Sequence, residues 1–349
     1  MPPDQKLSQL PYPVYFVRND PALCELFSDV QLMPAFDQFY RPESGGSSSW
    51  IVQTYLQLKC RGLDVKLVSH YVPGSICVVS REELMKRQLL KGMPFNSYLV
   101  VCQQDRPRPS ICEQRIVQNR RNILDKTDHF LPHWSQPDLK VRDPGRGDRV
   151  DNLVFKGRWY YMPDIYKNSD FVEQLSIEGF HFKTNPDYIV DLNDWTDYSE
   201  ADVILALRSR SDLYLDSKPP TKLINAWLAG CPALLGPEPA YQELRKSDLD
   251  YIEVNSPDEV ITALKRLRDN PSLYRAMVDN GRQRAKDFTP DQIALLWRDI
   301  LAGPVSTDYE RWSKQPIWKK LGRPIQFGYR LIGQELERRR FNKLTGRKR

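Results

Sequence analysis

Short runs of β-branched and aromatic residues alternate with segments of helical periodicity along most of the 349-residue chain. In the first half, this pattern predicts strands at 14–17, 30–36, 65–68, 76–79 and 98–102. A glycine-rich turn at 45–47 precedes apolar residues at three- and four-residue spacing, which are Trp50, Ile51, Tyr55 and Leu58. A strand, a glycine turn, a helix and a further strand form the βαβ pattern of a parallel sheet.

The alternation lapses between residues 131 and 150, where Pro, Gly and charged residues predict a linker. A second series follows, with predicted strands at 152–156, 188–191, 203–207, 233–235 and 251–254, and with helices at 171–178, 222–229, 240–245 and through most of 257–301. We therefore expect an α/β protein of two Rossmann-like, doubly wound domains, 1–145 and 150–305. Sheets of this kind bind ligands at the carboxyl ends of their strands, so we expect a ligand in the cleft between the halves.

The last segment, 307–349, is expected to rejoin the first domain. Its aromatic residues predict that it packs on the body of the protein, and they are Trp312, Trp318, Phe327 and Tyr329. Beyond it, residues 338–349 carry seven basic side chains and no acidic ones, whereas the whole chain has a net charge of +6. The remainder is therefore close to neutral. This basic tail predicts either contact with an anionic membrane surface or a disordered solubilising end.

Composition narrows the class of protein. A hydrophobic share of 40% can supply a core for each half. The longest apolar run, 224–236, is shorter than the roughly 18 residues that span a bilayer, and the N-terminus does not have the pattern of a signal peptide. The six cysteines occur singly and the four histidines are scattered, so neither a disulfide framework nor a metal site is expected. These features predict a cytoplasmic protein.

Residues 218–245 are the most informative segment for function. Lys218 and Lys222 bracket the start of a predicted helix, and a helix N-terminus beside a lysine can bind an anion. Gly230 ends this helix, and Glu238 follows the next strand at its carboxyl end. An ordinary amphipathic helix with surface lysines is the alternative interpretation.

This segment, in which a helix and the motif A-G-x-P precede a strand, resembles the donor-binding half of GT-B glycosyltransferases, most of all the large family-four-type group. The turn at 155–158 resembles the opening strand and turn of that group, where an Arg contacts the donor diphosphate, and 198–203 resembles the start of its central strand. The motifs at 269–271, 280–282 and 288–289 resemble its closing helices. The resemblance covers 151–301 in consistent order.

The resemblance implies a GT-B hexosyltransferase that moves a sugar from a nucleoside diphosphate sugar to the hydroxyl group of a carbohydrate, lipid or glycan acceptor. An enzyme of this kind is expected to need neither a metal ion nor a cofactor, and no nucleic acid is expected as a partner. Because the leaving diphosphate gains charge in the transition state, fixed cations there accelerate transfer. The expected catalytic residues are Arg208 and Lys222. The expected donor-binding residues are Arg158, Arg208, Arg210, Thr221, Lys222, Asn225 and Glu238, with Gly45 and Gly46 from the first domain.

The sequence also departs from the family pattern. That group carries two glutamates spaced E-x7-E, but Asn225 stands at the second position and Ser217 eight residues before it. Asp212 is a substitute for the first glutamate if the intervening loop is longer. The departure indicates a divergent subgroup and leaves the donor sugar and the stereochemical outcome open. A solvated loop position is an equal alternative for Arg210.

Candidate bases for the acceptor hydroxyl are Asp37, Glu43, His70 and His133, each of which also has a structural alternative. A tight turn is an equal alternative for Gly45-Gly46, and the D-x-D at 248–250 is interpreted as chance. Two other functions stay open: a sugar-nucleotide epimerase of the same fold, and a non-catalytic sugar-nucleotide-binding scaffold. Lys218, which precedes the helix, is expected to matter less than Lys222.

Overall fold

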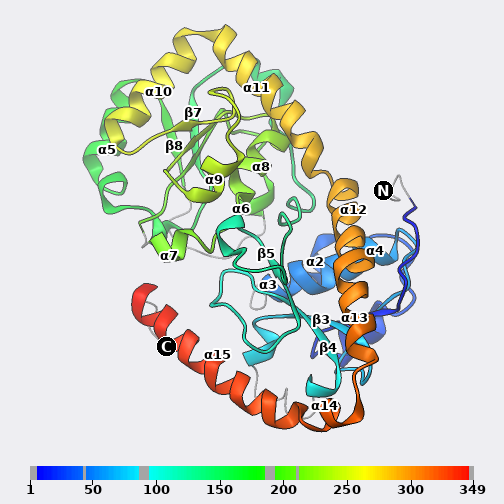
Figure 1. The fold of residues 1–349 in the computed structure, drawn as a ribbon. Coiled ribbons are helices and arrows are strands. Elements are labelled where there is room, and N and C mark those ends of the chain that lie inside the picture. The colour runs from blue at the N-terminus through cyan, green and yellow to red at the C-terminus, as the bar shows by residue number, and fades with distance from the viewer. Residues whose placement is uncertain (1–5, 42–44, 86–93, 185–192, 210–211, 346–349) are drawn as a thin grey trace. The chain divides into compact units, whose positions relative to one another are not determined.

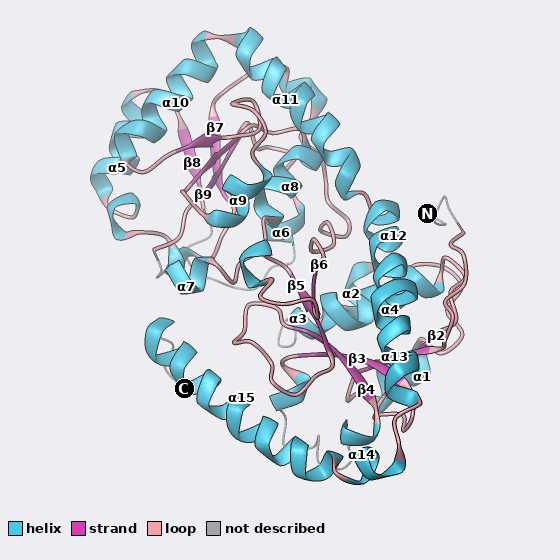
Figure 2. Cartoon of the chain, in the orientation of Figure 1, coloured by secondary structure: helices cyan, strands magenta, loops and turns pink. Residues whose placement is uncertain are grey.

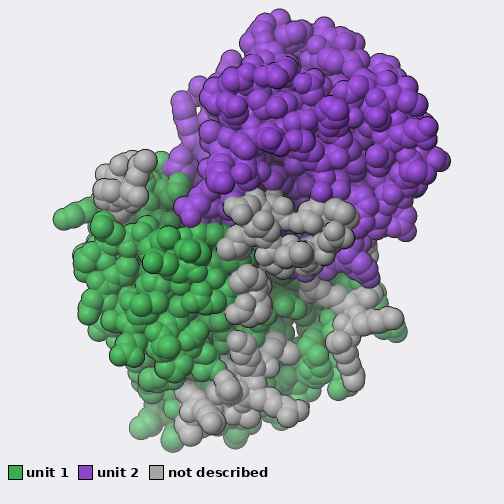
Figure 3. Space-filling view, turned by 180° about the vertical axis from the view of Figure 1, so that it is seen from behind, with its two compact units in different colours: residues 1–133, 290–349 green, residues 134–289 purple. Residues whose placement is uncertain are grey.

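The computed structural model describes residues 6–41, 45–85, 94–184, 193–209 and 212–345. Figure 1 shows its helices and strands, and Figure 3 colours the two compact units into which it divides. Unit 1 comprises residues 1–133 and 290–349, and unit 2 comprises residues 134–289. The strand predicted at 188–191 lies outside the described residues.

Unit 1 contains a six-stranded sheet in which every neighbouring pair is parallel (Figure 2). Its strands, in the spatial order β2-β1-β3-β4-β5-β6, are β2 (Val65–Val68), β1 (Val14–Val17), β3 (Ile76–Ser80), β4 (Tyr98–Cys102), β5 (Gln114–Val117) and β6 (Asp128–Phe130). Every residue of β3 and β4 is buried, as expected for central strands covered on both faces. The predictions of β1 to β4 are confirmed.

Two parts of that prediction are wrong. Strands β5 and β6 were not predicted, because polar residues such as Gln114 and Asp128 interrupt their apolar pattern. Residues 30–36 form no strand; Leu32 is 63% exposed there, and Pro34 lacks the N–H that a strand would need for pairing. The helix predicted after the glycine turn runs continuously through α3 (Gly45–Ser47), a π-helical stretch (Ser48–Gln53) and α4 (Thr54–Lys59).

The remaining helices of unit 1 lie on either side of unit 2 in the sequence. They are α1 (Pro21–Leu26), α2 (Phe36–Phe39), α12 (Pro290–Ile300), the π-helical Leu301–Val305, α13 (Ser306–Ser313), α14 (Ile317–Leu321) and α15 (Arg323–Thr345). Helix α12 contacts α4, and the ring of Trp297 lies 6.2 Å from that of Phe16 and 6.4 Å from that of Trp50. The chain therefore returns from unit 2 to complete the core of unit 1.

Unit 2 contains a five-stranded parallel sheet in the order β11-β10-β9-β7-β8. Its strands are β7 (Asn152–Phe155), β8 (His181–Lys183), β9 (Val203–Ala206), β10 (Ala233–Leu235) and β11 (Ile252–Glu253). Its helices are α5 (Ser169–Ile177), α6 (Asn193–Thr196), α7 (Asp212–Leu215), α8 (Thr221–Ala229), α9 (Pro239–Leu244), α10 (Pro257–Asp269) and α11 (Pro271–Ala285). Single 3-10 turns in the two units are Glu83–Met85, Pro94–Asn96, Arg120–Asn122, Pro144–Arg146, Trp159–Tyr161, Asp164–Tyr166 and Lys286–Phe288.

Strand β9 shows why unit 2 is doubly wound. Val203 and Leu205 belong to a buried cluster that includes residues of α5, α10 and α11, whereas Ile204 and Ala206 belong to a second cluster with residues of α8 and α9. Successive side chains of a strand point to opposite faces, so an unbroken apolar run requires helices on both. The two parallel α/β sheets expected from the sequence are thus present.

Two glycines have specific roles in and next to helices α8 and α11. Gly230 has φ +75° and ends α8 in the left-handed conformation, which leads the chain into β10. A Cβ atom at Gly281 would lie 2.9 Å from Cδ1 of Trp227, so only glycine fits there.

Asp250, from the D-x-D at 248–250, accepts hydrogen bonds from the backbone N–H groups of 246 and 247 and from Asn280 of α11. That motif therefore has a structural role.

Candidate functional site

Polar residues follow three neighbouring strands of the unit 2 sheet at their carboxyl ends. Lys156 comes directly after β7, Arg208 comes two residues after β9, and Glu238 comes three residues after β10. These strands are adjacent and parallel, with Phe155 opposite Leu205 and Leu235 opposite Ala206. The three side chains therefore begin at one edge of the sheet, where open α/β sheets bind ligands.

Arg208 and Glu238 form an ion pair through Nη1 and Oε2. Both side chains are almost entirely buried, and Oε1 of Glu238 has no hydrogen-bond partner. Burial lowers the pKa of the Arg208 guanidinium, but the adjacent Glu238 carboxylate more than offsets this and raises it above its ordinary value. Arg208 is therefore a permanent cation at this edge, and Glu238 retains a free acceptor.

Helix α8 begins at the same group of residues. Its N-cap position is Pro220, which makes no side-chain capping hydrogen bond. The N–H of Leu223 donates to the backbone oxygen of Pro220 at 3.1 Å, so the N–H groups of Thr221 and Lys222 are those left for another acceptor. Thr221, the first residue of α8, has a buried Oγ1 with no hydrogen-bond partner. Lys222 follows, with its Nζ 4.7 Å from the centre of the Trp195 ring. A positive helix end and a lysine thus meet at one place.

Lys222 lies in a strongly positive environment. Burial lowers the pKa of its amine well below the ordinary value, and Arg208, Lys218 and Lys156 lower it further, while Glu238 opposes them. We call Lys156, Arg208, Lys218 and Lys222, together with Glu238, the cation cluster. It holds four basic groups for one carboxylate. Charges of one sign are costly to bury, so this arrangement favours a bound anion that carries more than one negative charge.

Two members of the cation cluster were not among the predicted site residues: Lys156, and Lys218, which was expected to matter less than Lys222. Lys156 donates a hydrogen bond from Nζ to the backbone oxygen of Asp197 at 2.6 Å, and its position directly after a strand is the signal that could have found it. Lys218 precedes α8 as expected, but it is only 9% exposed and its Nζ lies 4.2 Å from the centre of the Tyr214 ring. Lys218 is therefore part of the cluster, together with Lys222.

Of the other predicted donor-binding residues of unit 2, Thr221 begins α8 next to Lys222, whereas Arg158 and Asn225 are not part of the cation cluster. Arg158 is exposed, and its backbone begins a 3-10 turn. Arg210 lies outside the described residues. Asn225 is buried one turn into α8, where its Oδ1 accepts a hydrogen bond from the backbone N–H of Gln136 at 3.3 Å. Ser217, eight residues before it, donates its hydroxyl to the backbone oxygen of Tyr214.

Unit 1 holds the remaining predicted residues. Gly45 and Gly46 begin the helical stretch of 45–59, and a Cβ atom at Gly46 would lie 2.8 Å from Nε2 of Gln104. Asp37 and His70 are exposed, and the ring of the half-buried His133 meets that of Trp50 edge-on at 5.3 Å. Glu43 lies outside the described residues. These base candidates stay predictions.

The opposite end of β9 carries a different polar group. Asp202, just before the strand, is completely buried and accepts hydrogen bonds from Arg142 and Arg146 at 2.7 Å and from the backbone N–H groups of 151 and 152 at 2.9 Å. Burial alone would raise the pKa of the Asp202 carboxyl, but these donors hold it below its ordinary value. Each of its oxygens has donors, so the group is structural.

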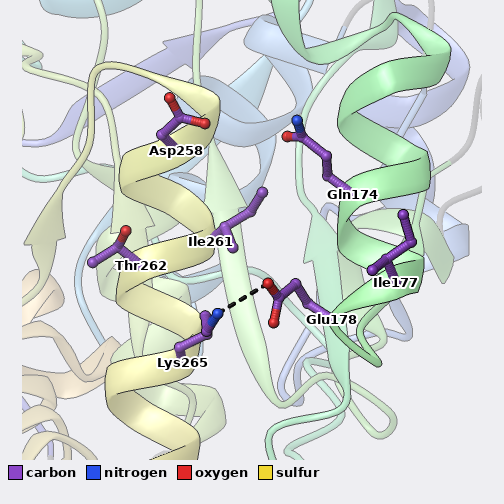
Figure 4. A pocket seen from close by; sticks show the side chains of 7 residues that line it. All are labelled: Gln174, Ile177, Glu178, Asp258, Ile261, Thr262 and Lys265. Carbon is purple, nitrogen blue, oxygen red and sulfur yellow. Dashed lines mark hydrogen bonds and ion pairs between the residues drawn. The ribbon is translucent and has the colours of Figure 1, made fainter.

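A groove between α5 and α10 is the other notable surface feature of unit 2 (Figure 4). Glu178 and Lys265 form an ion pair of 2.9 Å across it, and the remaining lining residues are Gln174, Ile177, Asp258, Ile261 and Thr262. None of these belongs to the cation cluster. Within the described ranges, no three His, Cys, Asp or Glu side chains come together as a metal site would require, and no helix is long and apolar enough to cross a membrane.

Comparison with known proteins relates this chain to glycosyltransferases. Residues 193–299 match a family model described as glycosyl transferase-like. The structure is similar to that of sucrose-phosphate synthase from Thermosynechococcus elongatus, with a TM-score of 0.53 and 13% identity over 83% of this chain and 99% of the other. This likeness and the two parallel sheets confirm the predicted GT-B glycosyltransferase fold.

A relative is known in Haemophilus influenzae. A protein named as an uncharacterized glycosyltransferase is 25% identical over 182 residues, which is 50% of this chain and 44% of that protein. The chain thus matches less than half of that relative's length. Together with the family match, this relative confirms the relationship to glycosyltransferases that the sequence motifs predicted.

Proposed function

We propose that the protein is a glycosyltransferase that moves a sugar from a nucleoside diphosphate sugar to the hydroxyl of a carbohydrate, lipid or glycan acceptor. The observation that carries this proposal is the cation cluster at the carboxyl edge of the unit 2 sheet. A diphosphate supplies several negative charges, and Arg208, Lys222 and the open N-terminus of α8 can neutralise them. The family match and the relative in H. influenzae support the same reaction class.

The cluster would act mainly on the leaving group. As the bond between the sugar and the diphosphate breaks, negative charge grows on the oxygen of the diphosphate, and cations already in place stabilise that charge more than the ground state. Lys222 and Arg208 are rigidly placed for this, since one is fixed in a helix and the other is held by Glu238. Oε1 of Glu238 can accept a hydrogen bond from a hydroxyl group of the sugar that is transferred.

The proposal is tested by nucleotide binding followed by turnover. Calorimetric titration with UDP, GDP, ADP and dTDP should identify one preferred nucleoside diphosphate, and its sugars should then be hydrolysed or transferred. Isomerisation of the sugar without transfer would assign an epimerase, and binding without turnover would assign a scaffold. If none of the four nucleotides binds, the proposed diphosphate site is overturned.

Transfer is also expected to survive EDTA. In this proposal arginine and lysine supply the positive charge that a divalent ion supplies elsewhere. Turnover should therefore change by less than about twofold after chelation. Activity that disappears with EDTA and returns with Mn²⁺ or Mg²⁺ would contradict the proposed role of the cation cluster.

We also propose that the protein works in the cytoplasm. All six cysteines are free thiols, as is usual in a reducing compartment, and burial raises the pKa of Cys77 to about 11 and that of Cys112 to about 12. The basic residues of 338–349 are proposed to draw the enzyme towards anionic surfaces by charge alone. Such attraction weakens as salt is added.

A further inference from the structure

The C-terminal helices of unit 1 have an unusual distribution of side chains. Figure 1 shows α14 and α15 as the long orange-to-red segment of the chain. The aromatic residues of 307–349 were expected to pack on the body. This is confirmed for Trp312 of α13 and Phe327 of α15, and is wrong for Trp318 and Tyr329, which are 65% and 74% exposed. Much of the apolar surface of α14 and α15 therefore faces outward.

The face of α15 that contacts unit 1 is held largely by polar groups. Arg323 donates to the backbone oxygens of 95 and 97 and to Glu113, and Arg330 donates to the backbone oxygen of 112 and to Glu113. Gln334 accepts hydrogen bonds from the backbone N–H groups of 110 and 111. These contacts orient the helix, because residues 323, 330 and 334 lie on one side of it.

The opposite face of α15 is apolar. Ile325, Tyr329, Ile332 and Leu336 follow one another at spacings of four, three and four residues, and each exposes 60% or more of its surface. At about 100° per residue these positions fall within an arc of roughly 60°. On α14, the side chains of Ile317, Trp318 and Leu321 are exposed to a similar degree. A surface helix normally turns its apolar stripe inward, and here the stripe is turned outward.

Basic residues accompany this stripe. Along the same outward face of α15, the apolar positions are followed by Arg339, Arg340 and Lys343, and α14 adds Lys319 and Lys320. Residues 317–345 contain eight basic and two acidic side chains. The acidic ones, Glu335 and Glu337, pair with Arg338, Arg339 and Arg340 of the same helix, and Lys319, Lys320 and Lys343 keep the net charge of this face positive. The outward face is therefore apolar and positively charged.

We propose that α14 and α15 form a docking surface for an anionic lipid bilayer, with the apolar stripe inserted at the level of the headgroups. Helices that lie in the membrane interface combine a Trp-containing apolar face with flanking Lys and Arg in this way. Charge complementarity selects anionic lipid over a neutral surface. The inference goes beyond sugar transfer and beyond the attraction of 338–349 alone, since insertion of the stripe predicts binding that persists in high salt.

The test is co-sedimentation of the full chain with phosphatidylcholine vesicles that contain or lack phosphatidylglycerol, at low and high salt. Wild-type protein should bind the anionic vesicles at both salt concentrations. A variant with Ile325→Asn, Tyr329→Asn and Ile332→Asn should lose at least about tenfold in partitioning and keep its thermal unfolding midpoint, because all three side chains are exposed. Arg339→Gln, Arg340→Gln and Lys343→Gln together should weaken binding mainly at low salt.

The matched control removes the same number of exposed apolar side chains elsewhere in unit 1. Leu26→Asn, Leu32→Asn and Leu124→Asn should leave vesicle binding within about twofold of wild type, since these residues are as exposed but lie outside α14 and α15. Equal binding by wild type and the α15 variant would overturn the proposal. So would self-association of the wild type in the absence of lipid that the α15 variant abolishes, because a second copy would then cover the stripe.

Discussion

The two ends of strand β9 carry buried polar groups that differ in charge balance and in how many of their hydrogen bonds are made. Before the strand, the Asp202 carboxylate is surrounded by two arginines and two backbone N–H groups, and every strong interaction available to it is made. After the strand, Arg208 meets one carboxylate while three lysines lie nearby, and Oε1 of Glu238 and Oγ1 of Thr221 have no partner. A buried polar group whose hydrogen bonds are complete stabilises the fold, whereas one with unpartnered polar atoms and excess positive charge is suited to a ligand.

The largest expected effect is at the Asp202 end. Asp202→Asn should lower the free energy of unfolding by about 3–5 kcal/mol, because the completely buried carboxylate loses its charge and two partly buried arginines lose their anionic partner. Urea unfolding measures this loss, and the affinity for nucleoside diphosphate should stay unchanged in the folded protein. Asp248→Asn, at an exposed carboxylate paired with Arg245, is the control and should cost less than about 0.5 kcal/mol. If both variants unfold alike, the Asp202 group is not the structural centre we describe.

Lys222→Met should lower transfer strongly without lowering stability, which is the reverse of the result expected for Asp202→Asn. Transfer should fall by roughly a hundred- to a thousandfold, about 3–4 kcal/mol, because a fixed cation beside the leaving group is lost. Stability should rise by about 1 kcal/mol, since an apolar side chain replaces an amine whose charge is costly to bury. Steady-state kinetics and thermal unfolding measure the two quantities. Lys183→Met, at an exposed lysine paired with Glu200, serves as the control and should change neither.

The role of Arg208 in transfer has to be tested in a double variant. Arg208→Ala alone would leave the buried Glu238 carboxylate without its cation and would destabilise unit 2, so the loss of transfer could not be assigned. Combined with Glu238→Gln, it should retain the fold and still lose transfer to an extent similar to Lys222→Met. Wild-type kinetics in this double variant would remove Arg208 from the site.

A change of pH is expected to have a smaller effect on stability and on the affinity for nucleoside diphosphate. The lowered pKa of Lys222 means that the folded protein binds fewer protons than the unfolded chain between that pKa and about 10.4, so this residue makes stability rise with pH in that window. A bound diphosphate favours the charged amine, so binding takes up a proton and affinity falls as pH rises, by at most about tenfold per unit. Calorimetry above pH 7 in two buffers of different ionisation enthalpy detects this uptake. The slope should vanish in Lys222→Met, and a slope unaffected by the substitution would assign it to another group.

The smallest expected effect is at Thr221. Thr221→Val preserves the shape of the side chain and removes a hydroxyl that has no hydrogen-bond partner in the protein. Stability should therefore fall by less than about 0.5 kcal/mol, while nucleotide affinity should drop by about 1 kcal/mol if the hydroxyl donates to the diphosphate. Ser217→Ala, which removes a hydroxyl that does have a partner, should instead lower stability. Unchanged affinity in Thr221→Val would place the diphosphate away from the first residue of α8.

Much of the fold and part of the site were accessible from the sequence because they depend on local pattern. Strands β1, β3, β4, β7, β9 and β10 are short, largely buried runs of mainly apolar residues, and β2 alternates apolar side chains with the exposed Lys66. Both patterns are recognisable without knowledge of the neighbouring strands. Parallel strands place their carboxyl ends at one edge, so Arg208 and Glu238 could be assigned to one site from chain order alone. Strands β5 and β6 escaped prediction because their polar residues hide the apolar alternation.

The sequence by itself thus determined the two parallel α/β sheets, a helix that begins next to Lys222 and the presence of basic residues near its start. Only the tertiary structure decided that Arg208 is paired with Glu238, that Lys156 and Lys218 are buried in the same cluster, and that the apolar face of α15 points outward. The physical reason is that helix and strand periodicity is set by neighbours in the chain, whereas burial and charge pairing depend on contacts between segments far apart in sequence. A periodic stripe shows that a helix has an apolar face, and only the contacts made by its other face show which way it turns.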